Sequence, residues 1–146
     1  MDPTNLTPPT QDERLLALLA HILQIVSWFI GPLVIFLVKR DSLFVRFHAL
    51  QALLWQAVLV VGWGIGMVGF MVAIFVTIAT QPQNPHPNAS PTAFFLGAFG
   101  FWLLMMGAMV LNLVLGIVYG IKANNGEWAR YPLLGRLAWR FCSNKG

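Results

Sequence analysis

The sequence contains very few charged residues. Lys, Arg, Asp and Glu make up 10% of the 146 residues, and none of the four occurs between Phe47 and Ile121. A water-soluble protein covers its surface with charged and polar groups, so an uncharged stretch of this length excludes a soluble globular class. A lipid bilayer supplies the surroundings that such a stretch requires. Together with 58% hydrophobic residues, this predicts one small membrane protein unit.

Cysteine is nearly absent as well, because Cys142 is the single one, and this excludes an internal disulfide. The net charge of +4 would suggest nucleic acid if the basic residues formed one surface patch. They stand instead at the ends of apolar runs, where basic residues orient helices and meet anionic lipid headgroups. We therefore expect no nucleic-acid partner. We expect lipid headgroup contacts from Lys39, Arg40, Arg46, Arg130, Arg136 and Arg140.

Three apolar segments are long enough to cross a membrane, since a hydrocarbon core of roughly 30 Å needs about 20 helical residues. We predict a mobile tail at 1–11 and a helical transmembrane domain at 12–126, with spans at about 15–38, 47–80 and 92–123. Gly31-Pro32 predicts a kink in the first span. The fold class is thus all-α, a membrane bundle of three long helices.

The C-terminal segment, 127–146, has a different character. Leu133, Leu137 and Phe141 recur at helical spacing, with Arg136 and Arg140 on a separate face. This pattern predicts a short basic amphipathic helix at the membrane interface.

The basic residues also predict an orientation. They gather in the first loop and in the C-terminal segment, so the positive-inside rule puts both in the cytoplasm. The N-terminus and the proline-rich loop at 81–91 then lie outside the cell. The alternative is a re-entrant first segment folded at Gly31-Pro32, which brings the N-terminus inside.

Small and polar residues inside the apolar segments predict helix contacts. Glycine faces let lipid-embedded helices approach closely, and paired polar side chains fix their register. The predicted packing residues are Gly62, Gly66, Gly69, Gln56, Asn112, Gly116 and Gly120. Gln56 and Asn112 fall at similar depth by helical rise, which predicts a hydrogen bond between them.

Two segments share His, Gln and Trp at identical spacing, namely His21, Gln24, Trp28 and His48, Gln51, Trp55. With three spans, the two sets begin at opposite sides of the membrane. One hypothesis is a cofactor-binding site for a lipid, quinone or tetrapyrrole, with imidazole as the metal ligand. The other is that these polar groups satisfy one another, backbone carbonyls or headgroups while Trp packs.

Several short motifs resemble those of the Tic-twenty-like family, small bacterial membrane proteins related to a chloroplast inner-envelope translocon subunit. They are Asp12-Glu13-Arg14-Leu15, Gly31-Pro32-Leu33, Lys39-Arg40-Asp41, the stretch from Phe44 to Leu53, and Ile121 to Glu127 followed by Arg130 to Leu133. The resemblance covers roughly 12–134 and implies a role near a protein translocon.

These observations predict a non-enzymatic, multi-pass scaffold or accessory subunit of a membrane complex. The sequence offers no catalytic residues and no metal-ligand spacing. Its expected partners are the bilayer and other membrane proteins or further copies of the chain. Binding of a lipid, quinone or tetrapyrrole is one alternative function. A small translocation element for peptides or solutes is another.

Overall fold

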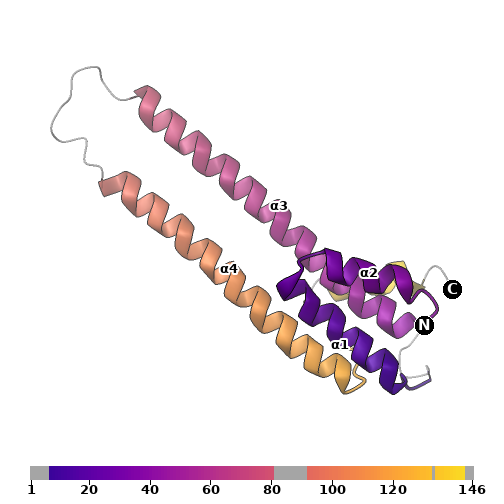
Figure 1. Ribbon diagram of the computed structural model, residues 1–146. Helices are drawn as coiled ribbons and strands as arrows, with labels where there is room; N and C mark the ends of the chain where they lie inside the picture. The colour runs from indigo at the N-terminus through magenta and orange to yellow at the C-terminus, as the bar shows by residue number, and fades with distance from the viewer. Residues whose placement is uncertain (1–6, 81–91, 133, 144–146) are drawn as a thin grey trace. The chain divides into compact units, whose positions relative to one another are not determined.

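The computed structural model describes residues 7–80, 92–132 and 134–143, which form helices and no strands. The helices are α1 (Gln11–Val26), α2 (Ile30–Val38), α3 (Leu43–Thr80), α4 (Thr92–Asn124) and α5 (Leu134–Ser143), as Figure 1 shows. The predicted all-α class is confirmed, and a short helix does follow the apolar segments. The predicted loop at 81–91 and most of the predicted tail lie outside the described residues.

The chain divides into two compact units, Met1–Val58 with Leu111–Gly146, and Leu59–Val110. The first unit contains α1, α2, α5 and the adjoining parts of α3 and α4. Among the described helices, α3 and the Phe95–Asn124 part of α4 are long and apolar enough to cross a membrane. At 1.5 Å per residue α3 is about 57 Å long, which exceeds the roughly 30 Å of a hydrocarbon core.

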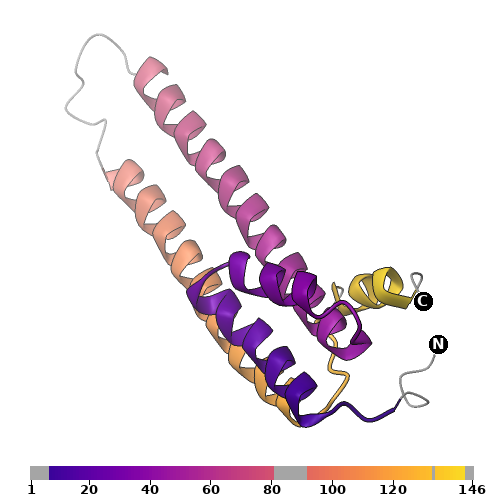
Figure 2. The same ribbon diagram turned by 45° about the vertical axis from the view of Figure 1, so that its right-hand side comes forward.

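The first apolar segment is a pair of short helices. α1 ends at Val26, and α2 begins at Ile30 and packs back against α1 (Figure 1, Figure 2). The prediction of one long helix kinked at Gly31-Pro32 is therefore wrong. Pro32 lies in the first turn of α2, where a missing N–H leaves no helical bond unmade. The chain reverses earlier, at Trp28, whose φ of 55° is in the left-handed region.

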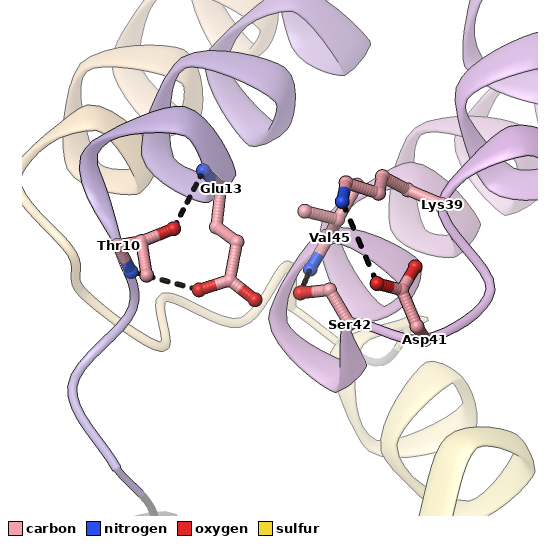
Figure 3. A network of polar contacts seen from close by, with 6 residues as sticks. All are labelled: Thr10, Glu13, Lys39, Asp41, Ser42 and Val45. Carbon is pink, nitrogen blue, oxygen red and sulfur yellow. Dashed lines mark hydrogen bonds and ion pairs between the residues drawn. The ribbon is translucent and has the colours of Figure 1, made fainter.

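Side-chain caps define where α1 and α3 begin (Figure 3). Thr10 Oγ1 accepts a hydrogen bond from the Glu13 N–H at 3.3 Å, and Glu13 Oε2 accepts one from the Thr10 N–H at 2.7 Å. Ser42 Oγ accepts from the Val45 N–H at 3.3 Å. A hydrogen bond from Ser42 is also the main cause that lowers the pKa of the Glu13 carboxyl.

These contacts place the start of α1 beside the start of α3. The chain therefore enters and leaves the α1–α2 hairpin at one end of the first unit. The predicted orientation has the N-terminus and the first loop on opposite sides of the membrane, and this hairpin does not fit it. The reason is the reversal at Trp28, which returns the chain to the end where it began.

Small buried side chains hold the first unit together, because they let helix backbones approach closely. Ala20 and Ala49 pack with Ile35 and Val45, which joins α1, α2 and α3. α5 covers Phe47 of α3 through Ala138 and Cys142, and Ala17 meets Phe44 and Ala123. All four alanines from α1, α3 and α4 in these clusters are fully buried.

A substitution at Gly116 tests whether the backbones of α1 and α4 approach one another closely. A Cβ atom there would lie 2.7 Å from Ile25 Cδ1 and 3.0 Å from the His21 carbonyl oxygen, which is backbone and cannot move freely. We expect Gly116→Ala to lower the free energy of unfolding by about 1–3 kcal/mol, as overpacking does. Titration with sodium dodecyl sulfate in mixed micelles measures this change.

Gly107 of the same helix is the matched control, because a Cβ there meets nothing within 4 Å. Gly107→Ala should leave stability unchanged or raise it by up to about 1 kcal/mol, since alanine is the better helix former. Equal effects of the two substitutions would show that α1 and α4 are not in the close contact described.

Candidate functional site

Five polar side chains from three parts of the first unit meet in its interior. His21 and Gln24 come from α1, His48 and Gln51 from α3, and Tyr131 from the segment between α4 and α5. The first four are fully buried, and Tyr131 is 2% exposed. Polar groups this deeply buried must find hydrogen-bond partners, and here they find them largely in one another.

A chain of hydrogen bonds runs through the two histidines. His48 Nε2 lies 3.1 Å from the Glu127 carbonyl oxygen, and His48 Nδ1 lies 3.1 Å from His21 Nε2. His21 Nδ1 lies 3.0 Å from the Tyr131 hydroxyl, which also accepts from Gln24 Nε2 at 3.2 Å. The chain thus joins α1, α3 and the segment after α4.

The direction of each bond in this chain of hydrogen bonds follows from the acceptor at its end, the Glu127 carbonyl oxygen. The Glu127 carbonyl can only accept, so His48 Nε2 carries a proton and donates. In neutral rings each histidine has one N–H, so His48 Nδ1 accepts from His21, and His21 Nδ1 accepts from the Tyr131 hydroxyl. Burial raises the pKa of Tyr131, which keeps that hydroxyl protonated.

This arrangement bears on ligand binding. All four ring nitrogens of the two histidines already have protein partners, so binding of a tetrapyrrole iron would first require one of these bonds to break. Within 7–80, 92–132 and 134–143, no group of three or more His, Cys, Asp or Glu could hold a metal ion. In the same part of the chain, Gln24 Oε1 is a buried atom without a hydrogen-bond partner.

Gln51 holds the segment after α4 by its backbone. Its Oε1 accepts from the Tyr131 N–H at 2.6 Å, and its Nε2 donates to the Ala129 carbonyl at 3.1 Å. Together with His48 it binds three backbone groups of residues 127–131. The site therefore fastens this segment to α3. We call the five side chains and their backbone partners the polar clamp.

Aromatic rings surround the polar clamp. Phe44 and Phe47 lie edge-on to His48, at centroid distances of 4.6 and 5.2 Å, and Tyr119 lies 4.2 Å from Tyr131. Phe44 also meets Trp128. These rings separate the hydrogen bonds from the surroundings, which strengthens each bond and raises the cost of breaking one.

The structure brings together only some of the residues in the two His, Gln and Trp sets. Both histidines and both glutamines enter the polar clamp, so the two sets do not begin at opposite sides as predicted. Trp28 lies apart at the hairpin turn and is 55% exposed. Trp55 Nε1 donates to Asn112 Oδ1 at 3.0 Å.

Gln56 and Asn112 form a second polar contact. Gln56 Nε2 donates to Asn112 Oδ1 at 3.2 Å and to the Gln24 carbonyl at 2.7 Å. This contact joins α1, α3 and α4 and, like other interhelical hydrogen bonds in membranes, contributes about 1 kcal/mol.

The predicted packing glycines divide into two groups. Gly116 and Gly120 face α1 at Ile25 and Leu18, and Gly66 faces Phe101 within the second unit. A Cβ at Gly62 or Gly69 would meet nothing within 4 Å. The second group leaves an open face on α3.

The predicted headgroup residues all belong to the first unit. Lys39 pairs with Asp41 at 3.5 Å, and Arg40 Nε donates to the Leu37 carbonyl. Arg130 lies over the Trp139 ring at 5.2 Å. Arg136 and Arg140 are exposed on α5, and Arg46 is close enough for its charge to oppose the burial that raises the pKa of Cys142.

Sequence reasoning missed Tyr131, which completes the polar clamp. It is 110 residues from His21, and no local pattern links the two. The turn that directs it back is visible in the sequence, because Gly126 follows Asn124-Asn125 and adopts a φ of 80° at the end of α4.

The family model described as the magnetosome magnetite crystal formation protein family, MamF/MmsF, matches residues 12–141. No curated protein and no solved structure gives a significant match. The resemblance to the Tic-twenty-like family is therefore wrong, and the translocon role that it implied is withdrawn. Two of the misleading motifs stand at helix ends, where the capping of α1 and the termination of α4 favour such residues. The stretch from Phe44 to Leu53 lies within α3 and carries His48 and Gln51 of the polar clamp.

Proposed function

Because the chain belongs to the MamF/MmsF family of magnetosome magnetite crystal formation proteins, we propose that it is a non-enzymatic accessory protein of the magnetosome membrane. The family match over residues 12–141 is the observation that carries this proposal. The two long apolar helices support a place in the membrane. The polar clamp supports a structural use of the imidazoles, since their nitrogen atoms are engaged with protein groups.

The proposed arrangement places the first unit and its basic residues at the cytoplasmic face, following the positive-inside rule. Lys39, Arg40, Arg136 and Arg140 would meet anionic headgroups there. The open glycine face of α3, at Gly62 and Gly69, supports contact with a further membrane helix, from another protein or a second copy of this chain.

The proposal is tested in a magnetosome-forming bacterium from which its own copy of this gene has been deleted. Electron microscopy should show crystals of altered size or number after deletion, and expression of this chain should restore them. Crosslinking in intact membranes should capture the chain with another membrane protein or with itself. Unchanged crystals after deletion would contradict the proposal.

The proposal that the protein is not an enzyme is tested with a separate variant. His48→Gln removes the imidazole as an acid or base but keeps a side chain that can donate to the Glu127 carbonyl. We expect this variant, at matched membrane abundance, to restore crystals as the unmodified chain does. A variant with unchanged thermal unfolding that fails to restore them would indicate that the imidazole takes part in chemistry.

A further inference from the structure

The turn between α1 and α2 exposes only large apolar side chains. Val26 is 77% exposed, Trp28 55%, Phe29 49% and Ile30 58%. Short connections between helices in water usually carry Gly, Asn, Asp or Ser, which hydrogen-bond locally and are well hydrated. A contiguous apolar tip marks contact with apolar surroundings.

Several backbone groups of this turn form local hydrogen bonds. The Ser27 N–H donates to the Leu23 carbonyl at 2.8 Å, and the Ile30 N–H donates to the Ser27 carbonyl at 3.1 Å. The Ser27 hydroxyl donates to Leu23 and accepts from the Gly31 N–H. Local pairing of this kind is what a chain reversal needs where no water can satisfy backbone groups.

Contacts within the first unit give the depth of the tip. The Gln24 carbonyl, just before the turn, accepts from Gln56, which lies about 20 Å along α3 from Leu43. Ile25 packs against Gly116 of α4. Both partners belong to the stretch from Phe47 to Ile121 that has no charged residue. The tip is therefore level with the uncharged part of the protein.

The other end of the hairpin is polar. Glu13 and Ser42 face one another there (Figure 3), and Lys39 and Asp41 flank them. α1 is about 24 Å long and α2 about 14 Å, so neither helix crosses a core of roughly 30 Å.

We propose that the α1–α2 hairpin is a re-entrant element, which enters the membrane from the face that bears Lys39 and Arg40 and ends among the acyl chains. The partner of its tip is the lipid of that leaflet. The proposal stands independently of any role in magnetite formation, because it depends only on contacts within the first unit.

The test uses the full chain in liposomes, with Cys142→Ser to remove the native thiol. One variant carries both Asp12→Cys and Asp41→Cys and is treated with a membrane-impermeant maleimide. If the hairpin returns, each molecule gains two labels or none, whichever way it was inserted, and intact-protein mass spectrometry shows this. A majority of singly labelled molecules would mean that residues 12 and 41 lie on opposite sides of the membrane. The segment from α1 to α2 would then cross the membrane once, which would overturn the proposal.

A second variant, Phe29→Cys, reports on the tip. It should resist the same maleimide supplied on both sides of the membrane and react fully after solubilisation in sodium dodecyl sulfate. Val58→Cys on α3 sets the labelling level expected for a lipid-facing position, since Val58 is as exposed as Phe29 and lies about 22 Å along α3 from Leu43, close to the level of Gln56. Labelling of Phe29→Cys well above that level, in a variant that unfolds at the parent temperature, would place the tip in water and refute the proposal.

Discussion

Replacing Gln51 with leucine is expected to release residues 127–131 from α3 and to lower the free energy of unfolding by about 2–5 kcal/mol. The substitution keeps the side chain's size but leaves the Tyr131 N–H and the Ala129 carbonyl without their partners. Each buried backbone group left unpaired costs about 1–3 kcal/mol. Detergent titration measures the loss of stability, and hydrogen exchange should show faster exchange at the Tyr131 amide.

Gln11→Leu provides the matched control, because Gln11 is exposed in the first turn of α1. The same exchange of side chains there should change stability by less than about 0.5 kcal/mol. If Gln51→Leu unfolded like this control and kept the Tyr131 amide protected, the polar clamp would not be the fastening described.

Tyr131→Phe should be almost as damaging, although it removes a single oxygen atom. That oxygen donates to His21 Nδ1 and accepts from Gln24 Nε2. Because Gln24 Oε1 already has no partner, the variant leaves the whole Gln24 amide buried and unpaired. We expect a loss of about 2–4 kcal/mol, since two buried groups lose their bonds at once.

Tyr119→Phe separates this effect from the general cost of removing a hydroxyl. The Tyr119 hydroxyl donates to the Arg130 carbonyl at an exposed position, where water can replace it. We expect a loss of less than about 1 kcal/mol. Similar losses for the two tyrosines would argue that Tyr131 is not part of a buried network.

The sequence predicts those elements whose causes are local. α3, α4 and α5 follow from the length of apolar runs and from the spacing of Leu137 and Phe141. The end of α4 follows from Gly126, which tolerates a left-handed conformation. The contact between Gln56 and Asn112 could be expected because helical rise alone puts them at one depth.

The rest depends on contacts between distant residues. An apolar run such as 15–38 suits either one spanning helix or two packed short ones, and the fit of Ala20 against Val45 and Ala49 decides between them. The polar clamp depends on Tyr131, which no periodicity connects to His21. His21 and His48 bond to each other and to protein groups, as one of the two sequence hypotheses has it, whereas Trp28 is exposed. Binding of a ligand at these residues stays a prediction.

The polar clamp also sets an order of events during biosynthesis. His21 leaves the ribosome 110 residues before Tyr131, to which its side chain is hydrogen-bonded in the folded protein. Until residues 127–131 emerge, the imidazoles and amides of α1 and α3 still need hydrogen-bond partners, and their final partners have not yet been made. Emergence of Tyr131 from the ribosome is thus the step that allows the first unit to close.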